Sequence, residues 1–588
     1  MTSLSRRQRW RDAVEVVRAE VTPYVARRLV QVLSLVVFGA AMNAVGPLAL
    51  KWLIDGVSGQ RPVRLAVGVL VGLYAGSQWL GRSSAELRAL QYARAERRIL
   101  RTLNERLFAH VLCLPLRYHL TRQTGAVSQT IENGLEGVRL ILHHLVFTVL
   151  PVCAELMLAG FVLYRLHQPV FLGLFSGAAL CYAVVFGRSA RHIGDSAREA
   201  AATRVAAGAV MTDGLMNFET VKAFGAESLV RGKAGRALER SEAAWIHFYR
   251  RYARNGLAVA AVFAVFLAAT LTYAVRAVHA GSLTLGGFVL VNTYMLQLVR
   301  PAEMLGFGVQ GFAQGAALLE KAMVLLSVVP ESVSGAPVPR TLDGGIEFDR
   351  VTLRYAPGRA ALESLSFTVG AGATLGIVGE SGSGKSSIVR LLLRLVEPES
   401  GVIRLGGLAL TEVSPGALRG AIAVVPQDVV LFDDTIEFNI TVAKPQASRA
   451  EVEHAVRIAQ LEEFIAALPE RYDTVVGERG VRISGGERQR IAIARAALRH
   501  PLVYVFDEAT SALDSRTEQA VLTRLRAAAG SATTMLIAHR LASVVHAQCI
   551  LVLQGGRVIE CGRHEALLQA QGRYAALWAA QHPGAAAA

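Results

Sequence analysis

Charged residues are scarce in this sequence of 588 residues: they make up 18% of it, whereas hydrophobic residues make up 52%. A single soluble globule of this composition would struggle to hide its apolar side chains from water. The length also exceeds what one compact core usually organises, so we expect at least two domains. The composition therefore predicts a chain of which a large part lies in a lipid bilayer.

Lysine is especially rare. The formal net charge of +16 comes almost wholly from arginine, because the sequence holds only six lysines. Such a charge fits either a nucleic acid or an anionic lipid surface as a partner. The apolar composition favours the lipid surface, and we expect no nucleic-acid partner.

Cysteine is also scarce, and its spacing excludes two kinds of site. The cysteines show no CxxC pairing and no regular spacing, so neither a disulfide framework nor a zinc site is predicted. We expect them to be packing residues. The five are Cys113, Cys153, Cys181, Cys549 and Cys561.

Long apolar runs, in contrast, are abundant in the first half of the chain. Six of them are long enough to cross a bilayer, although His143, His144 and Glu155 interrupt one and a histidine interrupts another. The six predicted spans are Val30 to Leu50, Leu65 to Gly81, Leu140 to Tyr164, Pro169 to Gly187, Asn255 to Val275 and Ala277 to Val299.

The connections between these spans alternate between short and long. The long ones, residues 82–139 and 188–254, hold most of the arginines and are rich in helix formers. We expect them to be helical hairpins that reach roughly 40 Å into the cytosol, where both chain ends then lie. Glycine-containing or broken stretches at 117–129 and 212–227 would form either a plain turn or a short helix crosswise to the hairpin arms.

The pattern changes at residue 346. Short β-rich runs such as ATLGIVG, LVYVFDE and TTMLIAH then alternate with helical stretches, which is typical of an α/β domain. The predicted divisions are a basic cytosolic segment (1–28), a helical transmembrane domain (29–329), a linker with proline, glycine and serine (330–345), the α/β domain (346–580) and a disordered tail (581–588).

The stretch GESGSGKSS at 379–387 carries the first chemical motif. Its residues Gly379, Gly384, Lys385 and Ser386 fit G-x-x-x-x-G-K-[ST], between an apolar strand and a helix. Glycines let successive backbone N–H groups point at phosphate oxygens, and the helix adds its positive end. Lys385 would neutralise the outer phosphates and Ser386 would ligate magnesium. A plain glycine-rich turn is the alternative, and the flanking strand and helix argue against it.

Two acidic residues end the apolar run LVYVFDE at 502–508, which suits a buried parallel strand. Asp507 would hold magnesium through water, and Glu508 would orient or deprotonate the water that attacks phosphate. By themselves, the two acids could equally cap a helix.

Further along, ISGGERQR at 483–490 resembles the signature motif of ABC transporters, and other motifs of that family occur in its order. Tyr355 resembles the aromatic residue that stacks on adenine, Gln427 in VVPQD resembles the Q-loop, and His539 in IAHR resembles the switch histidine. Two more segments are similar to an exporter segment that touches the membrane half and to the D-loop; they are GERG at 477–480 and SALD at 511–514.

The resemblance implies an ATPase coupled to transport, with ATP and Mg²⁺ as cofactors. The implied fold class is an α-helical six-span transmembrane domain with long cytosolic helical hairpins, followed by an α/β P-loop ABC nucleotide-binding domain. In that family two nucleotide domains meet head to tail, so the resemblance implies that this chain, with one such domain and six spans, pairs with a second copy as a homodimer. The implied ATP contacts are Tyr355, Gly379, Glu380, Ser381, Gly382, Ser383, Gly384, Lys385, Ser386, Ser387, Gln427, Ser484, Gly485, Gly486 and Asp507; those for magnesium are Ser386, Gln427 and Asp507; and those for catalysis are Glu508, His539 and Gln427.

The membrane half resembles one branch of these exporters, the mitochondrial iron-sulfur and heavy-metal-tolerance branch with its bacterial relatives. That branch implies a small-molecule cargo related to glutathione, to metal-thiol complexes or to sulfur-containing compounds. In the fourth and fifth spans, Arg188, Arg191, Asn255 and Val259 do not reproduce the residues that face glutathione in that branch. The similar segments are RQTGAVSQTIENG at 122–134, NFETVKAF at 217–224, GSLTLGGFVLVNTYMLQL at 281–298 and LGF at 305–307.

Three ionisable residues lie at or near membrane depth. Burying a charge in lipid costs about 3 kcal/mol, so such residues are candidates for the transport pathway. We expect Glu155, Arg300 and Glu303 to line a polar cavity in which Arg300 meets a carboxylate of the cargo. A structural pair between Arg300 and Glu303 at helical spacing is an equal alternative.

Other functions share part of this pattern. A lipid flippase or multidrug exporter would have every ATPase motif and a greasier cavity. A soluble regulatory or DNA-processing ATPase could use the same nucleotide domain, but six spans argue against it. The first twenty residues lack an apolar run ahead of a small-residue cleavage site, which argues against a removable secretory signal. We expect a bacterial inner-membrane protein with its nucleotide domain in the cytoplasm, in preference to a mitochondrial inner-membrane protein.

Overall fold

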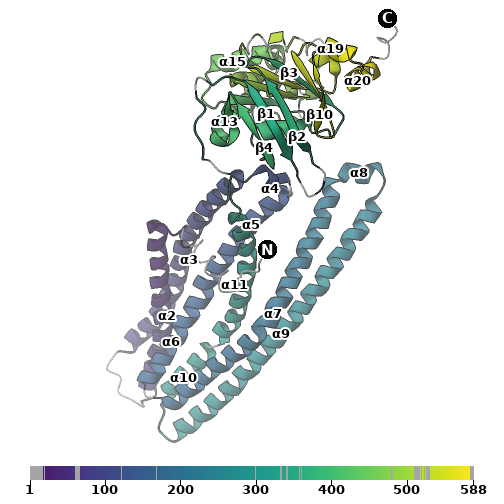
Figure 1. Cartoon of the computed structure of the whole chain (residues 1–588). Helices are drawn as coiled ribbons and strands as arrows, with labels where there is room; N and C mark the ends of the chain where they lie inside the picture. Colours follow the sequence, from purple (N-terminus) through teal and green to yellow (C-terminus); the bar gives the residue numbers. More distant parts are fainter. Residues whose placement is uncertain are drawn as a thin grey trace. The chain divides into compact units, whose positions relative to one another are not determined.

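The computed structural model in Figure 1 divides the chain into two compact units. Unit 1 comprises Met1–Leu114 and Arg122–Val329, and unit 2 comprises Pro115–Thr121 and Pro330–Ala588. The structure describes the chain outside residues 1–17, 19, 60–65, 121, 123, 167, 298, 332–333, 340–341, 356–357, 359, 478–479, 481–482, 509–516, 518–519, 522, 525–526, 528–529 and 583–588.

Unit 1 is entirely helical over the residues that the structure describes. Two of its helices are exceptionally long, with 48 residues in α7 and 53 in α9. Its elements are α2 (Pro23–Val57), α3 (Val67–Leu112), α5 (Thr124–His144), the π-helical turn η1 (Leu145–Val149), α6 (Leu150–Arg165), α7 (Pro169–Met216), α8 (Phe218–Ala223), α9 (Glu227–His279), α10 (Leu285–Gln297) and α11 (Val299–Leu326).

Among the residues that the structure describes, four helical segments are long and apolar enough to cross a membrane. They are Pro23–Val57, Gly125–Arg165, Pro169–Ser189 and Glu227–His279. The other two predicted spans fall on the first part of α3 and on α10. The sixth span was placed too early, because α9 continues to His279 and a turn then leads to α10 at Leu285.

The predicted long hairpin between the fourth and fifth spans is confirmed as a pair of helices. Helices α7 and α9 run side by side and α8 joins them at the tip, as Figure 1 shows. The arms are tied by Arg251 on α9, whose Nη1 donates to His192 O at 3.0 Å and to Ser196 Oγ at 2.8 Å on α7. The short helices α8 and, in unit 2, α4 (Leu116–Leu120) occur where the sequence predicted a turn or a short helix.

Helix α10 docks on α2 through a glycine and a buried carboxylate. The Gly286 N–H donates to Asp55 Oδ1 at 2.9 Å, and Lys51 Nζ lies 3.0 Å from Asp55 Oδ2. A Cβ at Gly286 would lie 2.2 Å from Lys51 O, so only glycine permits this approach. Tyr294 Oη then donates to Ala44 O at 2.8 Å. These contacts satisfy polar groups that would be costly to leave unpaired between membrane helices.

Unit 2 contains two sheets. The four-stranded sheet has the order β2-β1-β4-β5 and the six-stranded sheet the order β10-β9-β3-β8-β7-β6. In the larger sheet β9, β3, β8, β7 and β6 are parallel, and β10 is antiparallel to β9. The strands are β1 (Ile346–Leu353), β2 (Leu362–Val369), β3 (Thr374–Gly379), β4 (Ser400–Leu405), β5 (Leu408–Ala409), β6 (Ile422–Val425), β7 (Val503–Asp507), β8 (Thr533–Ile537), β9 (Cys549–Gln554) and β10 (Arg557–Gly562).

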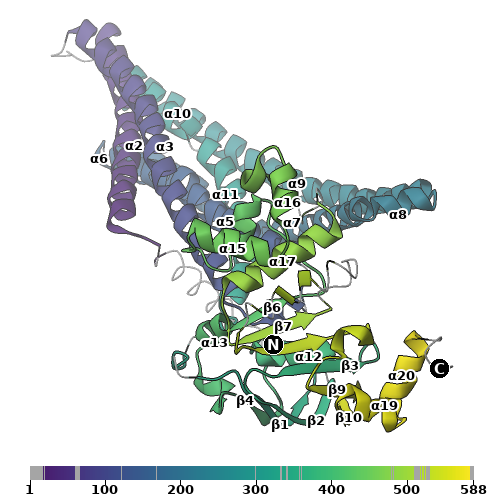
Figure 2. The same cartoon turned by 90° about the horizontal axis from the view of Figure 1, so that it is seen from above.

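The inner strands of this larger sheet are buried on both faces. All five residues of β8 are buried, as are the first four of β7. Figure 2 shows α19 and α20 at the β10 side of unit 2. The remaining helices of unit 2 are α12 (Lys385–Leu392), η2 (Leu410–Glu412), α13 (Pro415–Ala421), α14 (Ile436–Thr441), α15 (Arg449–Ile458), α16 (Glu462–Ala467), η3 (Arg471–Asp473), α17 (Gly485–Leu498), η5 (Leu541–Val544), α19 (His564–Gln569) and α20 (Arg573–Gln581).

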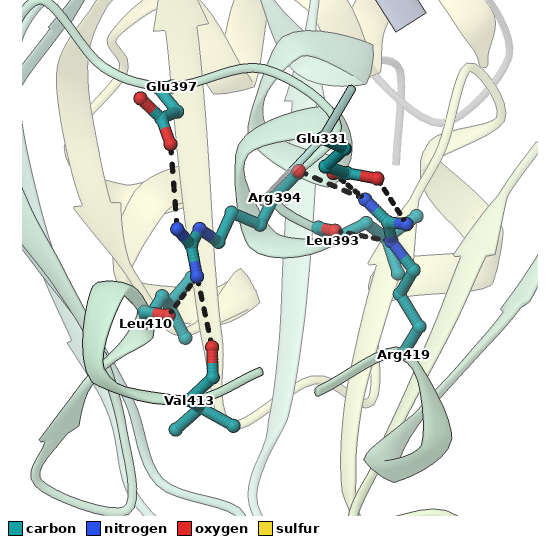
Figure 3. Close-up of polar contacts among 7 residues, drawn as sticks. All are labelled: Glu331, Leu393, Arg394, Glu397, Leu410, Val413 and Arg419. Atoms are coloured by element: carbon teal, nitrogen blue, oxygen red, sulfur yellow. Dashed lines mark hydrogen bonds and ion pairs between the residues drawn. The ribbon is translucent and has the colours of Figure 1, made fainter. Parts of the chain in front are cut away.

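The segment predicted to be a linker is attached to unit 2 over part of its length. The Ala336 N–H donates to Glu412 O at 2.8 Å, and the Ser414 N–H donates to Ala336 O at 2.9 Å. At its start, Glu331 is held by Arg419 of α13, as Figure 3 shows. The first turn of chain after Val329 therefore belongs to the surface of unit 2. At the other end of the unit, α20 extends to Gln581, into the predicted tail, and the rest of that tail from residue 583 lies outside the described residues.

Candidate functional site

The loop at residues 379–384 connects β3 to α12 and has a backbone that only glycine can adopt at two points. Gly379 and Gly384 have φ angles of 155° and 106°. A Cβ would lie 2.3 Å from Leu553 O at Gly379 and 2.7 Å from Ala361 O at Gly384. The sequence pattern G-x-x-x-x-G-K-S therefore produces a tightly wound loop of the kind that can turn successive backbone N–H groups toward an anion.

Lys385, the first residue of α12, is held inside this loop. Its Nζ donates to Gly379 O at 2.8 Å and to Glu380 O at 3.0 Å, and the residue is only 6% exposed. Burial lowers the pKa of this ammonium, whereas the nearby carboxylates of Glu508 and Asp507 raise it. An anion bound in the loop would stabilise the charged form of Lys385, which burial destabilises.

The acids predicted to follow the apolar strand lie at the carboxyl end of β7. Asp507 accepts a hydrogen bond from Ser386, and burial raises the pKa of its carboxyl group. Its Oδ1 is buried and has no hydrogen-bond partner among the described residues. A hydroxyl and a carboxylate with one unpaired oxygen are hard oxygen ligands of the kind that Mg²⁺ prefers, so Ser386 and Asp507 fit the ion.

Glu508 lies at the centre of a three-residue cluster. Its Oε1 lies 2.7 Å from His539 Nε2, and its Oε2 accepts a hydrogen bond of 2.7 Å from Gln427 Nε2. Glu508 has a φ of 51°, a left-handed conformation that costs energy in a residue with a side chain. Its backbone N–H donates to Ile537 O at 3.0 Å, which holds that conformation. The structure thus brings together all three residues predicted to be catalytic.

These three residues come from the same edge of the sheet. Gln427 follows β6, Glu508 follows β7 and His539 follows β8, while the phosphate loop follows β3. In parallel sheets the loops at the carboxyl ends of the strands form the ligand site. Fold topology therefore collects residues that are more than a hundred positions apart in the sequence.

Tyr355 lies against the first turns of α12. Its Oη donates to Ser387 Oγ at 3.2 Å and accepts from Arg390 Nη1 at 3.4 Å, and its ring centroid is 5.8 Å from the Arg390 guanidinium carbon. The aromatic residue predicted to contact the base thus lies beside the phosphate loop.

The signature segment forms the start of α17. Ser484 Oγ accepts from the Glu487 N–H at 3.3 Å, and the Ser484 N–H donates to Glu487 Oε2 at 2.6 Å, which together form a capping box. Gly485 and Gly486 are the first residues of the helix. The SALD segment lies outside the described residues, as do residues 478 and 479 of GERG.

The remaining predicted residues of the phosphate loop differ in their surroundings. Ser383 is buried, and its Oγ has no partner among the described residues. Glu380, Ser381, Gly382 and Ser386 are exposed. The Glu380 carboxylate pairs with Arg573 of α20.

Sequence reasoning missed this contribution of α20. Besides the pair between Arg573 and Glu380, the side-chain amide of Gln581 bonds to backbone groups on both sides of residue 540. No motif marks these two positions, because arginine and glutamine occur widely on exposed helix faces. Only the folded chain shows that they meet the phosphate loop and the switch-histidine loop.

In unit 1, Glu155 is part of a polar cluster between helices. Asn43 Nδ2 of α2 donates to Glu155 Oε1 of α6 at 2.9 Å, and Arg88 of α3 interacts electrostatically with the same carboxylate. The side chains of Arg300 and Glu303, the other predicted cavity residues, lie outside the described residues. All five cysteines are free thiols, and in unit 2 the Cys549 and Cys561 sulfur atoms are hydrogen-bonded at 3.2 Å.

Comparison with known proteins finds matches over both units. The ABC transporter family matches residues 362–511, and the ABC transporter transmembrane region matches residues 29–302. A structure of a bacterial Atm1-family ABC exporter with ATP bound is 36% identical and superposes with a TM-score of 0.85, covering 95% of this chain and 98% of that chain. The predicted fold class is thereby confirmed.

Curated relatives are similar over nearly the whole chain. An ATM1-type heavy metal exporter of Novosphingobium aromaticivorans is 37% identical over 567 residues, which cover 94% of this chain and 92% of the relative. The mitochondrial iron-sulfur clusters transporter ABCB7 of Homo sapiens is 36% identical over 560 residues, which cover 92% of this chain and 74% of the relative. Heavy metal tolerance factor 1 of Caenorhabditis elegans is 34% identical over 598 residues, covering 98% of this chain and 74% of the relative.

Proposed function

The chain belongs to the Atm1 family of ABC exporters, which couple ATP hydrolysis to transport, and we propose that it acts as a homodimer that exports a glutathione-related, metal-thiolate or other sulfur-containing compound. The observation that carries the ATP-driven part is the position of Glu508 between Gln427 and His539, beside the phosphate loop. The cargo and the pairing of copies are proposals that rest on further arguments.

The ATPase chemistry follows from the geometry of these residues. Backbone N–H groups of the loop and Lys385 would bind the β- and γ-phosphates, and Tyr355 would cover the base. Glu508 would accept a hydrogen bond from the attacking water and orient it toward the γ-phosphate. His539 would donate to the developing charge on the phosphate oxygens. Mg²⁺, when bound beside Ser386 and Asp507, would neutralise phosphate charge.

A homodimer is proposed because a single chain supplies only half of each ATP site. Within unit 2, the described residues of the loop contact Tyr355, Asp507 and α20, whereas Ser484 caps its own helix. The N-terminal end of α17 has N–H groups suited to a phosphate oxygen. In a head-to-tail pair, this end of one copy would close over ATP held by the loop of the other.

The cargo proposal rests on the named activities of relatives and on the polar cluster of unit 1. One relative is named as a heavy metal exporter and another as an iron-sulfur clusters transporter. Both kinds of cargo are carried in cells by thiolate ligands, which prefer soft metal ions. Glutathione-related and metal-thiolate compounds are the chemical class that heavy-metal cargo and iron-sulfur cargo have in common.

Glu155, Asn43 and Arg88 are proposed as contacts of that cargo. Ionisable side chains within membrane helices usually mark a pathway, because burying them otherwise costs free energy without benefit. A carboxylate, an amide and a guanidinium suit the amide, ammonium and carboxylate groups of a peptide thiol. Arg300 and Glu303 remain proposed members of the same cavity.

Stimulation of ATP hydrolysis tests the cargo proposal. The full-length protein would be reconstituted in lipid, and hydrolysis measured with glutathione disulfide, a mercury–glutathione complex, a hydrophobic amine or added phospholipid. We expect the first two compounds to raise the rate and the others to leave it unchanged. Stimulation by amine or phospholipid alone would instead indicate a multidrug exporter or a lipid flippase.

The proposed location is a bacterial inner membrane, with unit 2 in the cytoplasm. A bacterial relative matches this chain over 92% of the relative's length. The two long connections are rich in arginine, which favours the cytosolic side of the membrane for them. A mitochondrial inner membrane is the alternative, because ABCB7 relatives are named as mitochondrial.

A further inference from the structure

Gln581, the last residue of α20, binds two backbone groups of the loop that carries His539. Its Nε2 donates to His539 O at 2.6 Å, and its Oε1 accepts from the Leu541 N–H at 2.9 Å. The two bonds flank residue 540, so the amide fixes the backbone on both sides of it. Both directions fit one amide orientation, with the NH₂ group facing a carbonyl and the oxygen facing an N–H.

The other end of the same helix contacts the phosphate loop. The Arg573 guanidinium pairs with Glu380, the second residue of GESGSGKSS. The Tyr574 N–H donates to Glu560 Oε2 at 3.0 Å, and the Arg573 N–H donates to the other oxygen of that carboxylate, so β10 caps the start of α20. A helix of nine residues therefore contacts the phosphate loop at its start and the switch-histidine loop at its end.

The helix is itself firmly anchored. Tyr574 is fully buried, and its Oη bonds to His564 Nδ1 at 2.7 Å. The Trp578 ring lies 4.6 Å from the His564 ring and 4.1 Å from the His582 ring. Tyr574 belongs to the same hydrophobic core as Leu541, which follows the switch loop. Because α20 is rigid, it can hold the loop that carries His539 in a fixed position, which a frayed terminal helix could not do.

We propose that Gln581 is a positioning residue for ATP hydrolysis, which holds the switch-loop backbone so that His539 faces Glu508 and the γ-phosphate. The His539 side chain is 48% exposed, so packing alone does not fix it. Its contact of 2.7 Å with Glu508 therefore depends on the backbone from which it extends. Displacements of about 1 Å from a catalytic geometry can cost two orders of magnitude in rate.

The alternative is that Gln581 only satisfies two backbone groups at the end of a packing helix. The two possibilities differ in which kinetic constant changes. A positioning residue affects the chemical step after ATP has bound, because Tyr355 and residues 379–387 are untouched. A packing residue would alter folding stability, and with it the amount of active protein, without a selective effect on kcat.

The test uses the full-length protein with Gln581→Met, which keeps the length and helix propensity of glutamine but removes both hydrogen bonds. We expect kcat for ATP hydrolysis to fall about tenfold, while KM for ATP stays within about twofold and the unfolding temperature hardly changes. Gln569→Met is the matched control, because Gln569 is an exposed glutamine on α19. It should have the kinetic constants of the wild type.

A second variant, Gln581→Glu, tests the two hydrogen bonds separately. Its carboxylate can still accept from the Leu541 N–H, but between pH 6 and 8 it has no proton to donate to the His539 carbonyl. We therefore expect kcat of Gln581→Glu to fall about as far as that of Gln581→Met, again with KM for ATP within about twofold of the wild type. Wild-type kcat in either variant would overturn the proposal.

Discussion

The guanidinium of Arg419 binds both carboxylate oxygens of Glu331, with Nη1 lying 2.9 Å from Oε2. The same guanidinium donates to Leu393 O and to Arg394 O, each at 3.1 Å. Figure 3 shows the Arg419 guanidinium between the Glu331 carboxylate and the backbone of Leu393 and Arg394. Both side chains are about one-third exposed, so the pair is partly shielded from water. Arg419 therefore joins Glu331, at the start of unit 2, to the backbone that follows α12.

Replacing Arg419 with alanine should weaken this connection. The variant leaves two carbonyls and the Glu331 carboxylate without their donor, which costs about 1.5 to 3 kcal/mol for a charged hydrogen-bond set. We expect a lower unfolding temperature, and a smaller increase of ATP hydrolysis on adding cargo, with basal hydrolysis within about twofold of the wild type. Differential scanning fluorimetry and the ratio of stimulated to basal hydrolysis measure the two effects.

Arg404→Ala is the control for that prediction. Arg404 Nη1 lies 3.3 Å from Glu347 Oε1 on the surface of the four-stranded sheet, and exposed pairs of this kind contribute about 0 to 1 kcal/mol. Equal losses in the two variants would show that Arg419 has no special role in coupling.

The sequence predicted residues whose role depends on local pattern, and missed those whose role depends on distant contacts. Gly379, Gly384 and Lys385 could be assigned because one short loop contains every requirement of a phosphate site. The order of strands then brought Gln427, Glu508 and His539 together as the family resemblance implied. At these positions, backbone geometry and residue type allow few alternative roles for the residue.

The contacts of Arg419 and Gln581 have no such local signal. Each joins elements far apart in the sequence, and arginine or glutamine on a helix is usually a solvated surface residue. The sixth span was misplaced for a related reason: the largely apolar composition of 277–299 hides a turn at Gly281, which has a φ of 69°. Hydropathy indicates which residues are apolar enough for a bilayer, but it does not indicate where one helix ends and the next begins.

Glu508→Gln should separate ATP binding from ATP hydrolysis. The amide keeps the size of the carboxylate but cannot act as a base, and loss of such a group typically lowers a rate by about 10² to 10⁴. We expect ATP to bind with near wild-type affinity while turnover falls at least a hundredfold. Binding is measured with a fluorescent ATP analogue, and turnover by phosphate release.

Glu363→Gln provides the comparison for the catalytic acid. Glu363 pairs with Arg557 at 2.8 Å on the protein surface, outside the cluster around Glu508. Replacing Glu363 with glutamine should leave the turnover of ATP hydrolysis unchanged. Turnover by Glu508→Gln above a tenth of the wild-type rate would exclude the assigned role of Glu508.

Two variants distinguish a cargo contact from a structural hydrogen bond at Glu155. Glu155→Gln removes the charge but keeps an oxygen that can accept from Asn43, whereas Asn43→Leu removes the hydrogen bond between α2 and α6. If Glu155 contacts cargo, Glu155→Gln should raise the cargo concentration for half-maximal ATPase stimulation about tenfold at an unchanged unfolding temperature. If the bond is structural, only Asn43→Leu should have an effect, lowering the unfolding temperature by an amount that corresponds to about 1 kcal/mol.

His564 should make the docking of α20 sensitive to acid. Burial lowers the pKa of this imidazole below its usual 6.5, opposed by the charge of Glu565 and reinforced by His546. Because the folded state then binds fewer protons than the unfolded state, stability is greatest above pH 6.5 and falls as the pH decreases through and below that value. The unfolding temperature of the full-length protein should therefore decrease between pH 7.5 and 5.5.

His564→Asn tests whether this residue causes the decrease. Asparagine offers an oxygen in place of Nδ1, which can still accept from the buried Tyr574 hydroxyl, but it does not titrate in this range. The variant should lose part of the wild-type dependence on pH, at the cost of a lower unfolding temperature at pH 7.5 because its contact with the Trp578 ring is lost. His454→Asn on the exposed face of α15 should keep the full wild-type slope. If the unfolding temperature depends on pH equally in the wild type, His564→Asn and His454→Asn, then protonation of His564 does not cause the loss of stability in acid.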